Sequence, residues 1–394
     1  MKERAYKFNV ILYILIIYIL VFQNFLQTYI PVFKYIDELI AILGLFVACN
    51  KLVKNKFKIK KENLIIIACL LIIIIAGFTS IFLYHYQTIE YALIDCFLVI
   101  KFFCAYFLGR TLFEVTNLRK KSNTILINVK IISIILAIFT VANYVFDLYP
   151  GEIRFSIKSN QLFFSHPTYL VAIAIFLLAN YIVFSKKILS FCNILLLFII
   201  VSTLRVKAIC IAAVSVLIMI YILKTNRKIV FHKLLIFAIV CLLIALPQVR
   251  LYFVELGENA RKALLETSIE IANDYFPIGT GFGTFGSFES GENYSPIYEL
   301  YGINNVWGLQ KGKAYYVADS FWPMILGQFG YIGCIAYIIC IIMIFLKIQR
   351  EYSKKDKYTY AAKMICLAYL IISSTSESAF ANSIAIPLAL ILGL

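Results

Sequence analysis

The sequence predicts an all-α, polytopic integral membrane protein with about twelve membrane-spanning helices and one large extracytoplasmic loop. Three observations support this fold class. The chain of 394 residues is 62% hydrophobic, with a mean hydropathy of +0.89, whereas roughly half of a soluble domain is apolar. Apolar runs of about 20 residues, the length of a membrane-spanning helix, recur throughout. Basic residues concentrate in alternate connections between these runs. We treat residues 1–394 as one membrane domain.

The apolar runs give the order of the expected spans. They lie near residues 8–26, 35–53, 64–84, 89–109, 124–148, 167–184, 188–201, 208–223, 229–246, 320–346, 360–374 and 379–394. The basic clusters lie at residues 2–7, 51–61, 110–121, 186–187, 224–233 and 347–357. The positive-inside rule places these connections and both termini in the cytoplasm, so the protein is expected to be multi-pass in the cytoplasmic (inner) membrane. The net charge of +16 then reflects topology and contact with anionic membrane lipids, and nucleic acid is not an expected partner.

The longest connection, residues 247–319, contains no span and is expected on the extracytoplasmic side. Apolar residues at helical spacing predict an amphipathic helix that ends at Phe276, because Pro277 disfavours helical geometry in its predecessor. A segment rich in glycine and aromatic residues follows. Glycine lets a ligand approach backbone amides, and aromatic rings can stack on sugars. The segment is a candidate site for a phosphate-bearing oligosaccharide, through Gly279, Gly281, Gly283, Tyr294 and Tyr298.

A short turn carries the first pair of candidate cations. Residues 188–223 must cross the membrane twice, which leaves only a tight outer turn that holds Arg205 and Lys207. A cation slightly below the membrane surface costs about 3 kcal/mol unless an anion compensates it. A lipid pyrophosphate would supply that anion; the alternative is that both side chains extend to lipid headgroups.

Further basic residues face the same side. Arg261 lies on the predicted outer helix, where its guanidinium can clamp a phosphate through two N–H groups. The alternative for Arg261 is a solvated helix face. Arg154 and Arg250 either extend the basic surface or are solvated loop residues.

Two further polar residues stand at the outer ends of spans. His166 can bind a sugar or transfer a proton near neutral pH, or it can simply begin the helix ahead of Pro167. Asp319 is expected as the N-cap of the next span, and a carboxylate in this place could also deprotonate a sugar hydroxyl. The other outer carboxylates that remain candidates for such a base are Asp37, Glu38, Glu90, Asp95, Asp147 and Glu377.

The sequence predicts neither a metal site nor a bound cofactor. The three histidines, His85, His166 and His232, fall at different span ends and cannot form one metal site. The ten cysteines lie in or at the edges of spans, where they are expected to serve as small apolar packing residues.

Three blocks of this sequence resemble motifs of a known family. They are SHPTYL at residues 165–170, STLRVKAI at 202–209, and ARKALLETSIEIANDYFPIGTGFGTFGS at 260–287, with DSFWPMILGQFGYIG further on at 319–333. Together with about twelve spans and one long outer loop late in the chain, they resemble the O-antigen, capsular and exopolysaccharide polymerases (Wzy-type), which are related to the O-antigen ligases. The similarity covers most of the chain, and the glycine block with its upstream arginine and downstream DSFWP is its most specific part.

The resemblance implies a fold like that of the C-type membrane glycosyltransferases and a polyprenyl-pyrophosphate-linked oligosaccharide as substrate. A hydroxyl of the incoming repeat would attack the anomeric carbon of the growing chain, and the lipid pyrophosphate would leave. Arg205, Lys207 and Arg261 would bind and stabilise the pyrophosphate, and Asp319 or another outer carboxylate would be the base. The polyprenyl pyrophosphate is a substrate carrier, so the resemblance implies no cofactor. A chain-length regulator and a flippase are the protein partners it suggests.

Two other functions remain alternatives. O-antigen ligases, which transfer a lipid-linked glycan to a lipid or protein acceptor, carry a histidine in the large outer loop. Residues 247–319 contain no histidine, which favours a polymerase. A transporter or flippase for the same lipid-linked sugar is the other alternative, but the spans show no matching halves of the kind that many transporters have.

Overall fold

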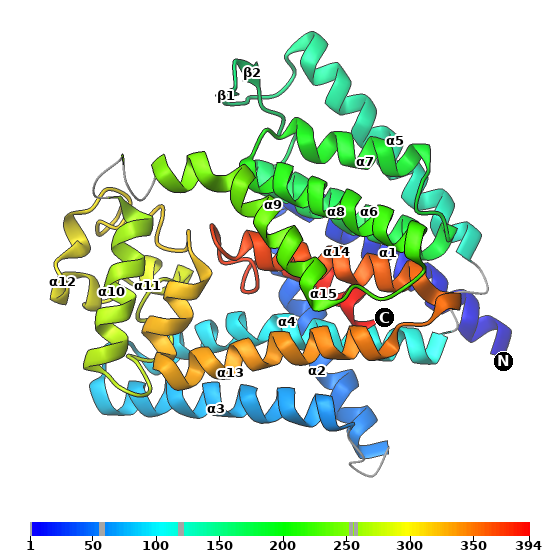
Figure 1. Cartoon of the computed structure of the whole chain (residues 1–394). Helices are drawn as coiled ribbons and strands as arrows, with labels where there is room; N and C mark the ends of the chain where they lie inside the picture. Colours follow the sequence, from blue (N-terminus) through cyan, green and yellow to red (C-terminus); the bar gives the residue numbers. More distant parts are fainter. Residues whose placement is uncertain (1, 55–59, 117–121, 252–254, 256–258) are drawn as a thin grey trace.

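The computed structural model describes the chain apart from residues 1, 55–59, 117–121, 252–254 and 256–258. The described chain is a helical bundle with one short two-stranded hairpin, which confirms the predicted helical character (Figure 1). Among the described residues, seven helices are long and apolar enough to cross a membrane. They are α3 (Lys61–Tyr84), α4 (Ile89–Thr116), α5 (Ser122–Phe146), α6 (Pro167–Ser185), α8 (Val206–Thr225), α9 (Phe231–Arg250) and α13 (Phe321–Glu351).

The other predicted spans coincide with helices that do not meet both criteria within the described residues. The prediction of a span at 379–394 is wrong in its extent. The last helix has 9 residues and covers about 14 Å, half of a hydrocarbon core of about 30 Å. The total of twelve spans is therefore not confirmed. The helices concerned are α1 (Lys2–Leu26), α2 (Ile36–Lys54), α7 (Phe191–Ser202), α14 (Lys357–Ser373) and α15 (Ala385–Gly393).

Helix α6 is the centre of the bundle. It is 89% buried, because α5, α7, α14 and α15 all pack against it. A second group joins α3 to α13 and α4 to both α2 and α15. The connections after α5, α7 and α14 and the start of α13 meet at one level of the bundle, and this level holds the candidate site.

Helix α9 lies at the edge of the bundle. Only 6% of its apolar stretch is buried, and it packs mainly on α8. Such exposure of an apolar helix suits contact with lipid. The helix runs through Pro247 to Arg250, so the prediction that the outer loop begins at Pro247 is wrong. The ring of Pro247 is accommodated inside the helix instead of ending it.

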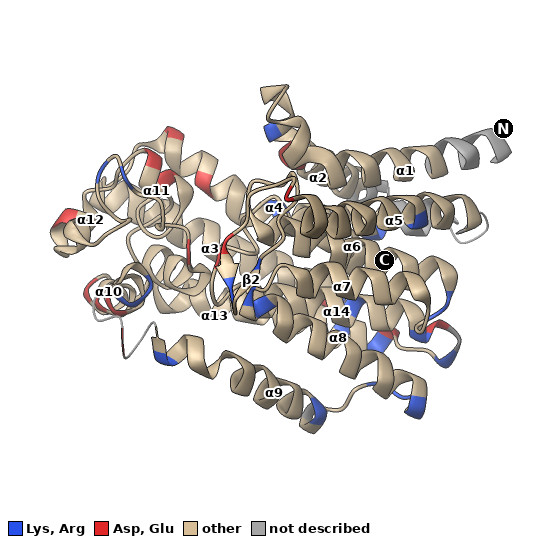
Figure 2. Ribbon diagram, turned by 90° about the horizontal axis from the view of Figure 1, so that it is seen from above, with Lys and Arg blue, Asp and Glu red and all other residues tan. Residues whose placement is uncertain are grey.

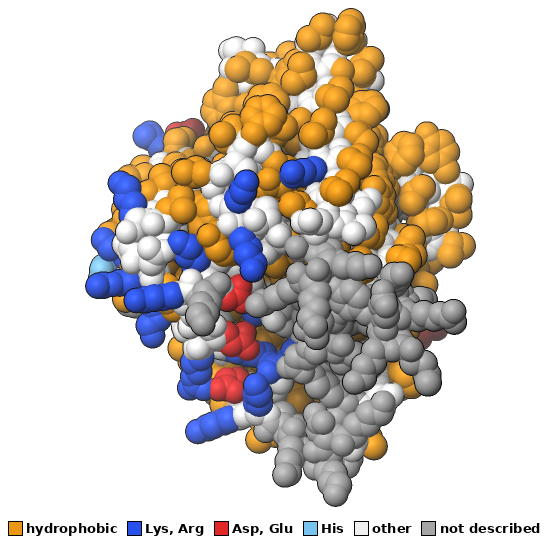
Figure 3. Space-filling view, turned by 90° about the vertical axis from the view of Figure 1, so that its right-hand side faces the viewer, with side chains coloured by type: hydrophobic (Ala, Val, Ile, Leu, Met, Phe, Trp, Pro, Cys, Tyr) orange, Lys and Arg blue, Asp and Glu red, His pale blue; other side chains and the backbone are white. Residues whose placement is uncertain are grey.

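The described Lys and Arg residues of the α6–α7, α8–α9 and α13–α14 connections gather at one end of the bundle (Figures 2 and 3). Acidic residues concentrate at the opposite end, on α10 (Ala260–Asp274), α11 (Phe288–Glu292) and α12 (Ile297–Leu300) (Figure 2). This asymmetry is the one expected from the positive-inside rule. Residues 55–59 of the predicted cluster at 51–61, residues 117–121 of the cluster at 110–121, and the side chains at 2–7 lie outside the described residues.

The connection after α9 folds into a helical layer at the predicted extracytoplasmic end (Figure 1). Its first helix, α10, confirms the predicted amphipathic helix. The side chain of Asn259 caps the helix, and Leu264 and Ile271 are buried on its apolar side. The helix ends at Asp274, slightly before the predicted end at Phe276.

Helix α13 is broken at Gly330, where φ is 58° and ψ is −162°. The rings of Phe321 and Tyr337 lie 5.0 Å apart, whereas an unbroken helix would separate them by about 24 Å. The part before Gly330 therefore folds back along the part after it. The predicted span 320–346 is a helical hairpin and not one straight helix.

The glycine-rich segment docks into this break. The carbonyls of Gly327 and Gln328, freed from helical hydrogen bonding by the break, accept hydrogen bonds from the N–H groups of Thr280 and Gly281 at 3.1 and 2.8 Å. The N–H of Gly283 donates to the Asp95 carboxylate at 2.8 Å. The segment is therefore fixed from two sides, by α13 and by α4.

We expect the Asp95 contact to determine how firmly the outer layer is held. Asp95→Leu should lower the free energy of unfolding by about 1–3 kcal/mol, because the N–H of Gly283 loses its acceptor in a buried place. Asp95→Asn should cost less, because an amide oxygen can still accept. Thermal unfolding in detergent and limited proteolysis of residues 260–319 measure both effects. Glu90→Leu, at an exposed site on the same helix, is the control, and an equal loss in the control would contradict this role of Asp95.

Candidate functional site

The first part of the site joins the outer helix to the start of α13. Arg261 lies in the first turn of α10, and its Nη2 donates to the Asp319 carboxylate at 3.1 Å. The N-cap of α13 is Ser320 and not Asp319. The prediction that Asp319 caps the helix is therefore wrong by one residue, because the Asp319 side chain turns to Arg261 instead of to the helix amides.

The second part of the site gathers around a carboxylate in the α5–α6 connection. Glu152 directly precedes the hairpin of β1 (Ile153–Arg154) and β2 (Ile157–Lys158). One oxygen of Glu152 accepts from Nε and Nη2 of Arg154 at 3.0 and 2.8 Å. The other accepts from Nη2 of Arg205, at the N-terminus of α8, at 3.1 Å. These hydrogen bonds and the two positive charges hold the pKa of Glu152 below its ordinary value, with Arg154 the largest contributor.

A fourth ion pair involves Lys207, near the start of α8. Lys207 Nζ lies 2.8 Å from the Glu377 carboxylate, and both side chains are mostly buried. The predicted tight turn before α8 is confirmed, since α7 ends at Ser202 and α8 begins at Val206. The turn therefore presents Arg205 and Lys207 to two different carboxylates.

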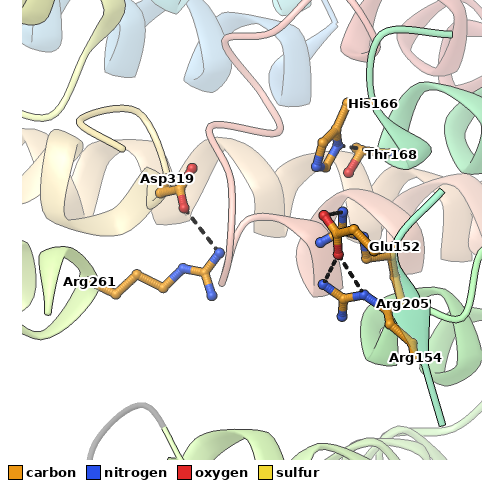
Figure 4. A network of polar contacts seen from close by, with 7 residues as sticks. All are labelled: Glu152, Arg154, His166, Thr168, Arg205, Arg261 and Asp319. Atoms are coloured by element: carbon orange, nitrogen blue, oxygen red, sulfur yellow. Dashed lines mark hydrogen bonds and ion pairs between the residues drawn. The ribbon is translucent and has the colours of Figure 1, made fainter. Parts of the chain in front are cut away.

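The connection from α14 to α15 brings the parts together. In Figure 4 this segment, in the faint red of the C-terminal region, passes between the Arg261–Asp319 pair and the group of Glu152, Arg154 and Arg205. Burial is the largest effect on the pKa of Asp319 and raises it. Arg261, and to a smaller extent Lys207, lower this pKa, whereas the negative charge of Glu377 raises it. The four ion pairs thus form one electrostatic cluster.

His166 stands beside this cluster as the N-cap of α6. Its Nδ1 accepts from the Thr168 N–H at 3.3 Å, so the neutral ring carries its proton on Nε2. Desolvation, followed by the charges of Arg205 and Lys207, lowers the pKa of His166 to about 4. The ring is therefore an uncharged hydrogen-bond donor at neutral pH, and the prediction that it begins the helix is confirmed.

Any activity that uses this cluster should not titrate with His166. Because its folded-state pKa lies near 4, below the unfolded value of about 6.5, the favourable neutral form is complete above pH 6.5 and is lost only as pH falls toward 4. We expect wild type and His166→Gln to show the same shape of pH–rate profile between about pH 5.5 and about pH 7.5. An inflection near pH 6.5 in wild type that disappears in the variant would contradict the lowered pKa.

The cluster is rich in positive charge for a place at the edge of apolar helices. Four cations, Arg154, Arg205, Lys207 and Arg261, face the three carboxylates of Glu152, Asp319 and Glu377. With His166 neutral, these side chains leave one net positive charge. An anion with several oxygens would restore balance, which makes the cluster a candidate phosphate or pyrophosphate site.

Several predicted site residues lie elsewhere. Arg250 pairs with Glu255 at 2.9 Å and is 74% exposed. Gly279, Gly281 and Gly283 are buried, with positive φ angles that suit glycine. Their N–H groups donate to Tyr275, Gln328 and Asp95, so these amides are already committed within the protein.

The two predicted tyrosines are part of the outer layer's own core. Tyr298 is fully buried, and its hydroxyl accepts from the Gly286 N–H at 2.9 Å. The Tyr294 hydroxyl donates to the Leu309 carbonyl at 2.8 Å, and the two tyrosine rings stack 5.2 Å apart. The geometry gives these residues and the three glycines a role in holding the layer, and we leave them out of the proposed site.

The sequence did not indicate Glu152 as a site residue, and it did not distinguish Glu377 from the other outer carboxylates. Glu152, which links Arg154 to Arg205, was not a candidate, because no helical or strand periodicity pointed to the hairpin beside it. Glu377 was one of several outer carboxylates, and only the fold places it next to Lys207.

The described residues contain no group of three or more His, Cys, Asp or Glu side chains that could hold a metal ion. No protein-family model and no curated protein matches this chain.

Proposed function

We propose that the protein is a membrane glycosyltransferase that polymerises polyprenyl-pyrophosphate-linked oligosaccharide repeats into O-antigen, capsule or exopolysaccharide. The reaction takes place on the outer face of the cytoplasmic membrane. The observation that carries this proposal is the convergence of Arg205, Lys207 and Arg261 from two distant helices on one charged cluster among apolar helices. A lipid-linked pyrophosphate is a substrate that needs both features.

The cations are suited to a pyrophosphate because carboxylates already orient them. A guanidinium has five N–H donors and an ammonium has three, so an ion pair with one carboxylate does not exhaust their capacity for phosphate oxygens. Side chains fixed before the substrate arrives need little reorganisation when charge develops on the leaving group. The ion pairs of Arg205 and Arg261 thus support leaving-group stabilisation as the main contribution to catalysis.

The bond changes follow from this arrangement. The hydroxyl oxygen of one repeat forms a bond to the anomeric carbon of the growing chain. The bond from that carbon to the pyrophosphate oxygen breaks, and its electron pair leaves with the pyrophosphate, where the cations stabilise it. The hydroxyl proton passes to a carboxylate of the cluster, for which Asp319 is the sequence-based candidate. His166 can donate its Nε2 proton in a hydrogen bond to a sugar or phosphate oxygen.

The test is incubation of the purified protein in detergent with its native lipid-linked repeat in the presence of a chelator. We expect gel separation to show a ladder of lipid-linked products with increasing repeat number. Transfer only after addition of a lipid or protein acceptor would replace the polymerase with a ligase. Movement of the lipid-linked repeat across sealed vesicles without any glycan transfer would replace it with a transporter.

A further inference from the structure

The connection between α14 and α15 is bound tightly to the start of α13. Both the N–H and the hydroxyl of Ser378 donate to the Ala318 carbonyl, at 3.1 and 2.9 Å. The indole N–H of Trp322 donates to the Ser374 hydroxyl at 3.1 Å. Glu377 and Asp319 are the immediate neighbours of Ser378 and Ala318. These hydrogen bonds therefore fix the two carboxylates beside each other on the two joined segments.

Glu377 is linked to both groups of cations, because it contacts Lys207, two residues from Arg205, and its neighbour Ser378 bonds to Ala318, next to Asp319. Its segment passes between Arg261–Asp319 on one side and the arginines bound to Glu152 on the other (Figure 4). One of its oxygens, Oε2, contacts Lys207 Nζ at 2.8 Å. A carboxylate that contacts one of these cations is close to any pyrophosphate that the cations hold.

The second carboxylate oxygen of Glu377 can accept a further hydrogen bond. Oε1 is buried and has no hydrogen-bond partner among the described residues. A buried acceptor without a donor costs free energy, and such a group at a site is explained when a ligand supplies the donor. The hydroxyl of a sugar is a donor of the right kind.

Asp319 is placed differently. Its Oδ2 accepts from the Arg261 guanidinium, and its pKa reflects burial opposed chiefly by that arginine. This pairing suits a residue that orients Arg261 for the pyrophosphate. The two carboxylates therefore differ. Asp319 is hydrogen-bonded to Arg261, whereas Glu377, besides its contact with Lys207, has a buried oxygen that can accept another hydrogen bond.

We infer that Glu377 is the general base that accepts the proton of the attacking sugar hydroxyl, and that Asp319 is a positioning residue for Arg261. This inference rests on the proposed function. The hydroxyl oxygen bonds to the anomeric carbon as its proton moves to the Glu377 carboxylate, and the lipid pyrophosphate leaves with the electron pair of the broken bond. The proton then passes from Glu377 to water. Lys207 links the two events, because it contacts Glu377 and can also bind the incoming pyrophosphate.

The experiment compares turnover with binding of polyprenyl pyrophosphate, the free leaving group. Glu377→Gln should slow ladder formation at least about 100-fold, the usual contribution of a general base, while binding of polyprenyl pyrophosphate stays equal or becomes tighter because a nearby negative charge is removed. Asp319→Asn should act in the opposite way, mainly by weakening polyprenyl pyrophosphate binding.

Two further variants keep the result interpretable. Glu377→Asp retains the carboxylate and should recover part of the rate, and Glu299→Gln, at an exposed place on α12, should behave as wild type. The assignment of the base is overturned if Glu377→Gln has wild-type turnover. It is also overturned if Glu377→Gln loses polyprenyl pyrophosphate binding together with turnover. In both cases, ladder formation by the wild-type protein leaves the proposed function intact. A wild-type protein that forms no ladder refutes the proposed function, and the base assignment falls with it.

Discussion

Arg205→Ala and Arg261→Ala should each lower the rate of polymer formation by at least about 100-fold, the usual effect of removing one preorganised group that stabilises developing charge. The Arg261 variant also leaves Asp319 without its described arginine contact, whereas Glu152 keeps Arg154 when Arg205 is replaced. The lost charge and the unbalanced carboxylate both oppose an anionic ligand. The measurement is ladder formation per mole of protein, together with the dissociation constant for polyprenyl pyrophosphate.

Lysine variants separate charge from geometry. Arg205→Lys and Arg261→Lys keep the positive charge but lose the planar fork that binds phosphate with two N–H groups, so we expect an intermediate loss of about tenfold. Arg250→Ala removes an exposed arginine outside the cluster and should leave the rate unchanged. Normal polymer from Arg261→Ala at wild-type abundance would refute the pyrophosphate assignment, as would an equal loss in Arg250→Ala.

The cations could be predicted from the sequence because the membrane restricts where charge can lie. Two helices and a turn had to fit into residues 188–223, so Arg205 and Lys207 had to be near the outer end of α8, and the structure places them there. Arg261 was predicted from its place on an amphipathic helix. Asp319 was predicted as a site residue, but the pairing of each cation with its carboxylate could not be predicted. Glu152 and Glu377 come from connections whose position depends on tertiary packing.

The glycine-rich segment shows the limit of composition as a guide. Glycines alternating with aromatic residues predicted an open ligand loop, yet their amides bond to Gln328 and Asp95 within the fold. The Gln328 carbonyl can accept only because α13 breaks at Gly330. Apolar periodicity alone could not predict this break, since the sequence on both sides continues as an apolar run. The short α15 was missed for the same reason, because its apolar length suggested a span.

Gly330→Ala should be the most damaging single substitution outside the charged cluster. The backbone at Gly330 lies in a region of φ and ψ that is almost restricted to glycine, so alanine costs about 1–3 kcal/mol in strain alone. An added Cβ would also collide with the carbonyl oxygen of Pro277. We expect a clearly lower unfolding temperature in detergent and loss of polymer formation, because the break positions both the glycine-rich segment and the helix that follows Asp319.

Gly302→Ala is the matched control for this substitution. Gly302 also has a positive φ, 67°, but no atom lies within 4 Å of an added Cβ. Its cost should therefore be limited to about 1–2 kcal/mol for the left-handed conformation, and polymer formation should persist. If both variants lose activity equally, the strain of a positive φ explains the loss and docking into the break does not. If Gly330→Ala is as stable and active as wild type, α13 does not need its break to form the site.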